Sequence, residues 1–413
     1  MSQEKIVEGL LAINKPQGIS SAQALRDLQT HFNPSRLFAP WLAAEKDRRF
    51  QESKHQRKRR RDKRSPQVKI GHGGTLDPLA TGVLIAGIGR GTKRLQSFLT
   101  CTKTYEAVVL FGVATDSYDR LGKVLARAPY KHLTREMVAE SLEKFRGKIM
   151  QRPPIFSALR VQGKKLYEYA REGKEVPIEI QERPVEVLNL ELVQWMEGGT
   201  HEHRWPVEEA PGEEKAVADK VLHMKTEQSP EDVPSRQTSG TKRELEIPEN
   251  DDLFSSPPSA KRPRQSSVPS EPLMSGGLGS PPPPPPPPPS PPAHPNPNPS
   301  SPTSNSPQNT TDDTSPPQPP AALLRLTSTS GFYVRSLCHD LGASLGSLAV
   351  MAELVRTRQG DFELGQNVLE YDDLEHGEDV WGPKVTALLE KSNDVGSEER
   401  TRRSVSEDGD GGG

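Results

Sequence analysis

Residues 71–84 read GHGGTLDPLATGVL, and this glycine-rich stretch decides how the rest of the chain is interpreted. It contains four glycines and a single acid, Asp77, among small and apolar residues. A lone carboxylate in such a loop either forms a turn by hydrogen-bonding to its own backbone or acts as a reagent. Pro78 favours an extended backbone at Asp77, and Gly74 and Gly82 let another backbone approach closely. Composition alone favours the turn, while the spacing also allows Asp77 to face a ligand.

The spacing of the glycines and histidines does not support a nucleotide-binding site or a metal site. A phosphate-binding P-loop closes with Gly-Lys-Ser or Gly-Lys-Thr, and GHGGTLDP does not. The GIGRG run at 87–91 does not match the dinucleotide pattern Gly-x-Gly-x-x-Gly. The Cys-His-Asp run at 338–340 is not expected to be a catalytic triad, because neighbours on a helix point to different faces. Histidines such as His31, His55 and His72 show no metal-ligand spacing, so we expect no metal and no cofactor.

The composition limits how much of the chain can form a packed core. Of the 413 residues only 32% are hydrophobic and 5% aromatic, while 41 are proline, so much of the length is expected to lack a core. The two cysteines, Cys101 and Cys338, suggest no disulfide framework and favour a reducing compartment. The longest apolar runs, such as 107–114, have the length of a strand, so we expect neither a membrane span nor a secretory signal.

The periodicities of the remaining segments predict one α+β domain. Helices are expected at 20–32, with Ser20 or Ser21 as the N-cap, at 134–147, with Thr134 as the N-cap, and at 335–346. Strands are expected, in chain order, at 7–15, 83–89, 102–116, 185–195, 321–334 and 348–364. This order predicts a mixed or antiparallel sheet flanked by helices.

The predicted domain runs from 5 to 388 and is not continuous in the sequence. The segments without periodicity are a basic, irregular insertion (34–67), a Pro/Ser-rich insertion predicted to be disordered (197–320) and a loose polar tail (389–413). Such insertions are tolerated because the entropy of loop closure grows slowly with loop length. The strands expected at 185–195 and 322–328 flank the longer insertion, so we predict that they pair as a hairpin with an enlarged loop.

Basic residues gather in two short clusters. The run KHQRKRRRDKR, residues 54–64, is interpreted as a solvated loop, a nuclear localisation signal or an RNA-binding arm, and its charge density favours the last two. The Lys-Arg-Pro-Arg run at 261–264 weakly repeats the nuclear signal. We therefore expect a nuclear protein, with the mitochondrion or the cytoplasm as alternatives. If the arm binds phosphates, deleting 54–64 weakens RNA binding and flattens its salt dependence.

Six stretches, in order, resemble the motifs of the TruB family of RNA pseudouridine synthases, and most closely its eukaryotic tRNA-modifying branch. GLLAINKPQGISS (9–21) resembles the opening motif, GHGGTLDPLATGVL the catalytic loop, and KTYEAVVLFGVATDSYDRLG (103–122) the strand with the active-site tyrosine. QRPPIFSALRVQGKKLYEYAREG (151–173) resembles the RNA-gripping segment, GFYVRSLCHDLG (331–342) the arginine motif, and LVRTRQGDF (354–362) the final signature. The resemblance implies the pseudouridine synthase fold, with a central RNA-binding cleft.

The resemblance also implies a reaction. This family breaks the N1–C1′ glycosidic bond of uridine, rotates the base and joins C5 to C1′. The implied substrate is tRNA, most specifically uridine 55 of the T loop, which must be flipped out of its stack. Asp77 takes the place of the nucleophile and forms a covalent intermediate at C1′ or at C6; the sequence leaves both open. No metal or redox cofactor is implied.

Four further residues are assigned to the substrate by the same resemblance. Arg335 is expected to pair with Asp77 and to offset the cost of burying its charge. Tyr105 matches the tyrosine that stacks on the target base and takes part in proton handling at C5, and Tyr333 is expected beside it. His72 is expected to fill or flank the gap that the flipped base leaves in the RNA.

The chain departs from the family pattern at some positions. Gly73 stands where the family usually has threonine, and Arg160 replaces a lysine with retention of charge. The residues after Phe362 are too few for the RNA-binding PUA domain of many relatives, so we expect a stand-alone enzyme that uses no guide RNA and is a monomer. The alternatives are a non-catalytic tRNA-binding chaperone, additional action on mRNA hairpins that resemble the T loop, and a docking role for the proline-rich insertion.

Overall fold

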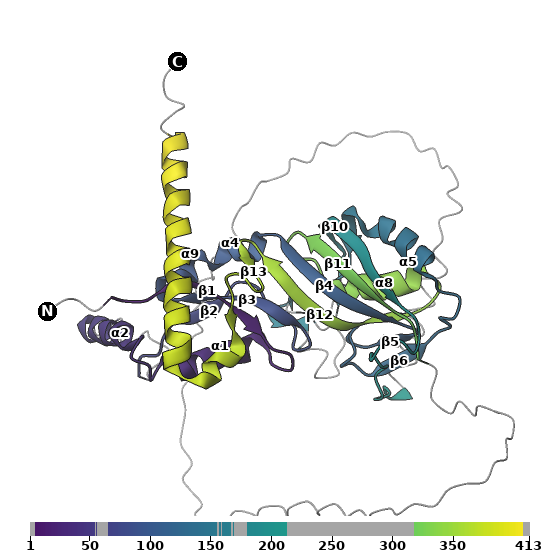
Figure 1. Cartoon of the computed structure of the whole chain (residues 1–413), viewed down its shortest axis with the longest axis horizontal. Helices are drawn as coiled ribbons and strands as arrows, with labels where there is room; N and C mark the ends of the chain where they lie inside the picture. The colour runs from purple at the N-terminus through teal and green to yellow at the C-terminus, as the bar shows by residue number, and fades with distance from the viewer. Residues whose placement is uncertain are drawn as a thin grey trace, which may run out of the picture. The chain divides into compact units, whose positions relative to one another are not determined.

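The computed structural model describes residues 5–53, 55, 65–154, 157, 159–166, 168, 180–212 and 318–407, with side chains up to residue 393. These residues belong to one compact unit, Met1–Ser229 together with Ser315–Gly413 (Figure 1). The basic residues at 56–64 and 261–264 and most of the proline-rich insertion lie outside the described residues. No helix in the described part of the chain is both long and apolar enough to cross a membrane.

A ten-stranded mixed sheet forms the centre of the unit, as the α+β prediction requires. Its order is β14-β1-β3-β12-β4-β11-β10-β7, with β13 paired to β12 and β2 paired to β3. The pairs β1–β14 and β3–β12 are parallel, and the other pairs are antiparallel. The strands are β1 (Gly9–Lys15), β2 (Ile70–His72), β3 (Thr81–Ile88), β4 (Lys103–Phe111), β7 (Gly147–Gln151), β10 (Arg183–Met196), β11 (Ala321–Ser328), β12 (Ala349–Gln359), β13 (Phe362–Glu363) and β14 (Leu369–Glu370).

Strands β10 and β11 confirm the predicted hairpin across the long insertion. They pair antiparallel from Val187 opposite Ser328 to Met196 opposite Ala321, with two register shifts. Two smaller two-stranded sheets lie outside the main one: β5 (Val113–Thr115) with β6 (Val124–Arg127), and β8 (Arg160–Val161) with β9 (Lys164–Lys165).

The helices pack on the sheet through apolar faces that share one large core. Helices α1 (Ser21–Phe32), α5 (Arg135–Leu142), α8 (Val334–Ser344) and α9 (Glu378–Glu407) all contribute to it. Short helices connect the strands: η1 (Gly89–Arg94), α4 (Leu95–Thr100), η2 (Glu143–Phe145) and η3 (Tyr371–His376). Successive side chains of β4 point to opposite faces of the sheet, so Tyr105, Val109 and Phe111 join the large core. Val108 and Leu110 join a second core, which also includes Val113 of β5 and Val124 of β6.

The predicted helix starts are confirmed by their caps. The hydroxyl of Ser20 accepts a hydrogen bond from the Gln23 amide at 3.1 Å, and Thr134 caps α5 in the same way through Met137. Each cap satisfies one amide that the first helical turn leaves without a partner. Helix α5 ends at Leu142, earlier than predicted, and the chain continues through η2.

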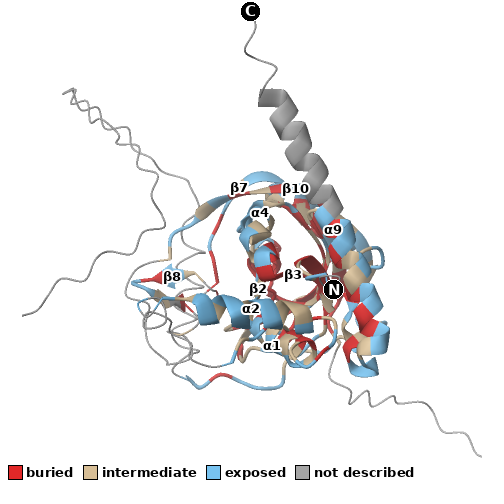
Figure 2. Ribbon diagram, turned by 90° about the vertical axis from the view of Figure 1, so that its left-hand side faces the viewer, coloured by how far each residue is buried: buried red, intermediate tan, exposed pale blue. Residues whose placement is uncertain are grey.

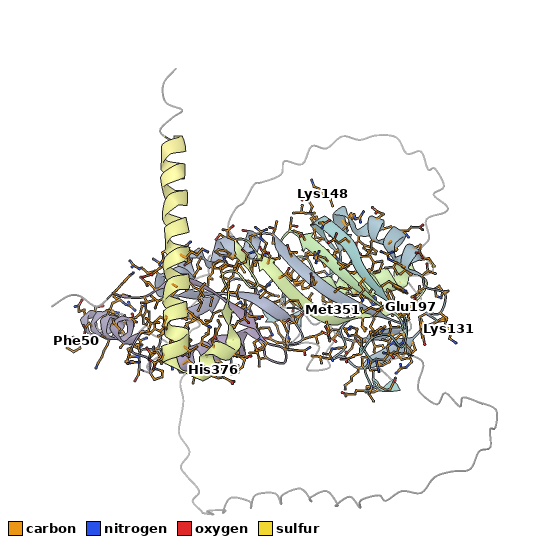
Figure 3. All side chains as sticks on the ribbon, viewed as in Figure 1. Phe50, Lys131, Lys148, Glu197, Met351 and His376 are labelled. Carbon is orange, nitrogen blue, oxygen red and sulfur yellow. The ribbon has the colours of Figure 1, made fainter. Side chains whose placement is uncertain are left out.

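Helix α2 (Ala39–Gln51) lies within the segment that was predicted to be irregular, so the prediction is wrong there. The residue before the helix, Phe38, is fully buried and stacks on Phe32 with ring centroids 4.5 Å apart. Arg48 forms an ion pair with Glu45, three residues earlier, at 2.7 Å. Ion pairs at this spacing stabilise a helix even where basic residues obscure the apolar pattern in its sequence. The helix has no buried residue of its own (Figure 2), and Phe50 is 80% exposed (Figure 3).

Two further boundaries differ from the prediction. A loose tail was expected at 389–407, but helix α9 continues through these residues. Two contacts hold the start of this part: Leu389 joins the core, and the Asn393 amide donates to the Glu8 carbonyl at 2.9 Å. Residues 197–212 were assigned to the disordered insertion, but residues 208–210 pair with β6. The Val124 amide donates to the Glu208 carbonyl at 2.8 Å, and the Ala210 amide donates to the Val124 carbonyl at 3.0 Å. The Trp205 indole donates to the Phe111 carbonyl at 2.8 Å. The rest of that insertion, 213–317, lies outside the described residues.

Candidate active site

Asp77 lies in the loop that joins β2 to β3. Its carbonyl accepts a hydrogen bond from the Ala80 amide at 3.1 Å, so the backbone does form a turn. Its side chain remains 34% exposed and forms an ion pair. The two interpretations of this residue are therefore compatible, because the main chain makes the turn and the carboxylate stays available to a ligand.

The start of α1 holds the loop on both sides of Asp77. The buried Ser21 hydroxyl donates to the Leu76 carbonyl at 3.0 Å and accepts from the Leu76 amide at 2.8 Å. The Gly18 amide donates to the Pro78 carbonyl at 2.8 Å. The Gly-Ile-Ser-Ser stretch that begins at Gly18 thus serves as a backbone clamp, which limits the positions that Asp77 can adopt.

Two side chains of β12 hold the Asp77 loop and its neighbours through hydrogen bonds. The Arg356 guanidinium, 1% exposed, donates to the Val83 carbonyl at 2.7 Å and to the Gly74 carbonyl at 3.3 Å. The Gln359 amide donates to the Gly73 carbonyl and, at 2.8 Å, to the Phe98 carbonyl. Sequence reasoning did not single out Arg356 or Gln359, although both lie in the stretch that resembles the last family motif.

Gly82 shows why a glycine follows the loop. Its φ is +100°, and a Cβ there would lie 2.3 Å from the Arg356 carbonyl oxygen. Both the left-handed backbone and this close approach exclude any other residue type. The contact brings β3 directly against Arg356, which donates a hydrogen bond to the Asp77 loop.

Arg335 makes the predicted ion pair with Asp77. Its Nε donates to Oδ2 of Asp77 at 2.8 Å, and its Nη1 donates to the Ser117 carbonyl at 2.8 Å. The Arg335 side chain is only 4% exposed and stands in the first turn of α8. A guanidinium held by a fixed carbonyl presents its remaining N–H groups in defined directions.

A second carboxylate, Asp119, faces the same guanidinium and was missed by sequence reasoning. Its Oδ2 lies 3.9 Å from Arg335 Nε, and its Oδ1 accepts from the Ser117 hydroxyl at 2.8 Å and from the Leu121 amide at 3.0 Å. Burial raises the pKa of Asp119, and the Ser117 hydrogen bond and the Arg335 charge oppose that rise. The available signal was an acid in the short turn after β5, within the 103–122 stretch that also contains Tyr105.

Lys15 is a second cation whose charge interacts with Asp77. It is fully buried, and its Nζ donates to the carbonyls of Pro16 at 2.7 Å and Ile19 at 2.8 Å. Burial lowers the pKa of Lys15 to about 8, against the opposing effect of the Asp77 charge. The ammonium therefore ties together the turn that leads into the clamp around Asp77.

The other predicted site residues lie on neighbouring elements. Tyr105 is 8% exposed in β4, directly opposite Arg356 of β12. Tyr333 precedes α8 and exchanges two backbone hydrogen bonds with the Gln151 side chain, while the Arg183 guanidinium lies 4.7 Å over its ring. His72 is half-buried in β2, opposite Ala86. The contact of Tyr333 with Tyr105 and the roles of all three residues toward RNA stay predictions.

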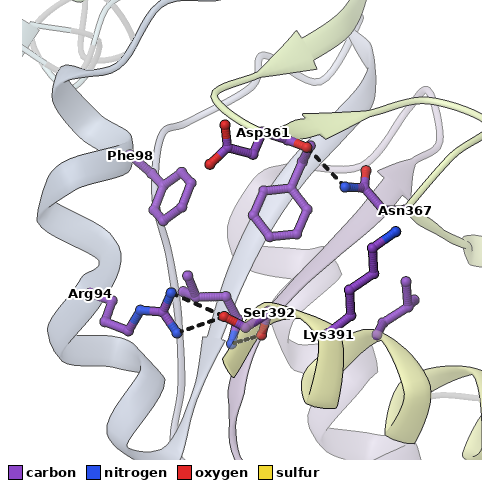
Figure 4. Close-up of a pocket in the computed structure, with 9 residues that line it drawn as sticks. Arg94, Phe98, Asp361, Asn367, Lys391 and Ser392 are labelled. Atoms are coloured by element: carbon purple, nitrogen blue, oxygen red, sulfur yellow. Dashed lines mark hydrogen bonds between the residues drawn. The ribbon is translucent and has the colours of Figure 1, made fainter. Parts of the chain in front are cut away.

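A cavity elsewhere in the unit holds none of the five predicted residues (Figure 4). It lies between α4, the β13 region and α9, where both terminal nitrogens of Arg94 donate to the Ser392 carbonyl. It is lined by Leu10, Arg94, Phe98, Asp361, Phe362, Asn367, Leu388, Lys391 and Ser392. The Asp77–Arg335 pair, and not this cavity, is therefore the candidate centre for chemistry. Among the described residues, no cluster of three or more histidine, cysteine or acidic side chains is arranged to hold a metal.

Family models match two parts of the chain. Residues 59–210 match the N-terminal domain of the TruB family pseudouridylate synthases, and residues 335–388 match the C-terminal domain of tRNA pseudouridylate synthase B. The first match includes Asp77, and the second begins at Arg335.

Known proteins resemble the chain over most of its length. It is 38% identical to tRNA pseudouridine synthase 4 of Schizosaccharomyces pombe, over 92% of this chain and 85% of the relative. It is 31% identical to tRNA pseudouridine synthase 4 of Saccharomyces cerevisiae, over 97% of this chain and 89% of the relative. A solved structure titled as a Cbf5-Nop10-Gar1 complex is similar at a TM-score of 0.39 with 16% identity, over 93% of this chain and 61% of that chain.

Proposed function

Because the chain belongs to the TruB family of pseudouridine synthases, we propose that it isomerises uridine 55 in the T loop of tRNA, with Asp77 as the nucleophile. The full-length relatives are named as tRNA pseudouridine synthases, which supports tRNA as the substrate. The observation that carries the assignment of Asp77 is its 2.8 Å ion pair with the buried Arg335, on a loop clamped from both sides.

The reaction is an isomerisation, so it consumes no oxidant, reductant or second substrate. The Asp77 carboxylate adds to C1′ or to C6 of the uridine, and the N1–C1′ bond breaks with its electron pair passing to the base. The base rotates, and C5 forms the new bond to C1′. In the C1′ route the Asp77–C1′ bond breaks as C5 attacks C1′, whereas in the C6 route the Asp77–C6 bond breaks as the C5 proton is lost. In both routes C5 loses its proton and N1 takes one up.

Arg335 fixes the direction in which the carboxylate attacks. Its Nε occupies Oδ2 of Asp77, so we assign the attack to Oδ1. A charge-assisted hydrogen bond is strongest with an ionised carboxylate, which is the form that a nucleophile requires. Because the Ser117 carbonyl holds Nη1, Arg335 cannot follow Asp77 freely, and the pair keeps one geometry.

The substrate base must leave the RNA stack before it reaches Asp77. We assign Tyr105, on the strand next to β12, to the face of the flipped base, and Tyr333 to its edge. His72, in the strand that leads into the loop, is assigned to the vacated position in the RNA. His72 lies on the strand that leads into the Asp77 loop, and Tyr333 directly precedes the helix that carries Arg335. Tyr105 lies on β4, which β12 separates from β3 in the sheet order.

Tritium release tests the proposal directly. An unmodified tRNA transcript labelled at C5 of uridine loses tritium only when C5 becomes bonded to C1′. We expect the unmodified chain to release one equivalent, and Asp77→Asn to be slower by about 10³-fold or more. The matched control is Asp379→Asn, which changes an acid that is 92% exposed and paired with Arg36; it should react normally.

Changing the sequence of the RNA transcript tests which uridine is modified. A transcript with cytidine at position 55 should release no tritium, and one with cytidine at another loop uridine should react fully. Equal rates for the unmodified chain and Asp77→Asn would show that another group is the nucleophile. Absence of release from a bound transcript would favour the chaperone alternative. The same assay on short mRNA hairpins tests whether T-loop-like sequences are also substrates.

A further inference from the structure

A ring stack between Tyr118 and His339 lies beside the Asp77–Arg335 pair. Tyr118 belongs to the 115–122 loop that follows β5, and His339 lies on α8. Their ring centroids are 4.1 Å apart and the planes are inclined by only 5°. His339 is 5% exposed. This contact joins the loop that carries Asp119 to the helix that carries Arg335.

Tyr118 has a backbone conformation that a tyrosine rarely adopts. Its φ is +63°, and among the described residues only Gln162 is another non-glycine with positive φ. A left-handed conformation crowds the Cβ of any L-residue other than glycine, so it persists only where surrounding contacts impose it. Here the Tyr118 amide donates to the Thr115 carbonyl at 3.3 Å, and its carbonyl accepts from the Met351 amide at 3.0 Å.

The turn at Tyr118 brings both of its neighbours to one guanidinium. The carbonyl of Ser117 accepts from Arg335 Nη1 at 2.8 Å, and the carboxylate of Asp119 lies 3.9 Å from Arg335 Nε. An extended residue between them would separate Ser117 from Asp119 by about 6.6 Å along the chain. The strained conformation of Tyr118 is therefore what lets one short loop contact Arg335 twice.

The spacing on α8 matches this arrangement. Arg335 and His339 are four residues apart, so their side chains lie on the same face of the helix. Consecutive residues of the loop meet that face: Ser117 and Asp119 contact Arg335, and Tyr118 contacts His339. The ring stack is the second attachment point of the loop on α8, and it resists rotation of the loop about the first.

We propose that Tyr118 and His339 are positioning residues for catalysis, because their stack holds the 117–119 segment against Arg335 and thereby fixes the orientation of Arg335 toward Asp77. Neither ring contacts the substrate in this role. The catalytic readout rests on the proposed function, since it requires Asp77 to be the nucleophile. The effect should fall on kcat and leave KM unchanged, because the geometry of the reacting carboxylate changes while the RNA-binding surface does not.

Substitutions at position 118 separate the stack from the backbone strain. Tyr118→Gly adopts the positive φ without crowding but removes the ring, whereas Tyr118→Phe keeps the ring. We expect Tyr118→Gly to lower kcat in the tritium-release assay by between about ten- and a hundredfold, with KM within twofold. Tyr118→Phe should retain kcat within twofold.

His339 provides the matching half of the experiment. His339→Ala should reproduce the loss of kcat seen in Tyr118→Gly, and His339→Phe, which preserves an aromatic stack, should restore it. The double variant should be no slower than either single variant, because both remove the same contact. If Tyr118→Gly is too unstable to assay, the comparison of His339→Ala with His339→Phe decides the question.

The outcomes are distinguishable from failure of the proposed function. If the unmodified chain releases no tritium, or if Asp77→Asn is fully active, the proposed function fails before these variants are compared. If the unmodified chain is active and Tyr118→Gly and His339→Ala keep kcat within twofold, the positioning role is wrong. A rise in KM alone would likewise overturn it, because that result would place the rings in RNA binding.

Discussion

The Ser21 clamp offers the most direct test of how the fold positions Asp77. Ser21→Ala removes one hydroxyl that is 2% exposed and makes two hydrogen bonds, to the amide and to the carbonyl of Leu76. Leu76 is itself 3% exposed, so water does not replace the lost partner easily. The residue next along the chain from Leu76 is Asp77, so any relaxation moves the proposed nucleophile directly.

The magnitude follows from counting the polar groups that lose a partner. Leaving a buried donor or acceptor unsatisfied costs about 1–3 kcal/mol, so two such groups give a loss of roughly 2–6 kcal/mol in the free energy of unfolding. The adjacent Ser20→Ala is the matched control. It removes only the α1 N-cap bond to Gln23, a change that costs about 1 kcal/mol.

Urea unfolding and tritium release together measure the two effects. We expect Ser21→Ala to be less stable than Ser20→Ala by roughly 1–5 kcal/mol, and to lose kcat by about tenfold or more through displacement of Asp77. Ser20→Ala should retain its kcat. Equal stabilities of the two variants, together with an unchanged kcat for Ser21→Ala, would refute the inference that this clamp positions the catalytic loop.

The remaining predictions concern the support of the same site. Gly82→Ala should destabilise the fold by more than about 3 kcal/mol, because its Cβ would overlap the Arg356 carbonyl. Gly147→Ala, at φ +73° in open space, should cost only about 1 kcal/mol, and similar melting temperatures for the two variants would contradict this reasoning. Burial raises the pKa of Asp119, so the folded state holds that proton more tightly than the unfolded state, and stability from this group is lost as pH rises through the unfolded and then the folded pKa. Urea unfolding of Asp119→Asn and the unmodified chain at a series of pH values should therefore show the variant gaining relative stability as pH rises from about 4; a constant difference would mean that Asp119 does not titrate abnormally.

Local patterns in the chain determined much of the architecture. The alternation of apolar residues identified β10 and β11 on both sides of the long insertion, and Ser20 and Thr134 marked the starts of α1 and α5. These predictions succeed because strand and helix periodicity and N-caps depend on residues that are close in the sequence. The α9 boundary failed for the converse reason, since Leu389 is buried in a core formed by distant segments. Helix α2 follows Phe38, whose burial against Phe32 is not revealed by the polar sequence of the helix.

The residues of the candidate site could be predicted from the sequence only where they lie within the family motifs. The resemblance pointed to Asp77 and Arg335, and the structure places them in contact. Nothing local in the sequence pointed to Asp119, Lys15 or Arg356 as parts of the same cluster. Buried polar groups of this kind make sense only once their partners are known, because an isolated lysine or arginine in a sequence is most often exposed.

The sequence by itself therefore determined most of the strands and helices and the residues available in the Asp77 loop, whereas tertiary structure decided which groups meet. Arg335 is 258 residues from Asp77 along the chain, and Arg356 is 273 residues from Val83. These contacts depend on β12 lying between β3 and β4 and on α8 packing against β12. The order of strands in a sheet is set by the burial of all their faces together, which no single segment of the sequence encodes.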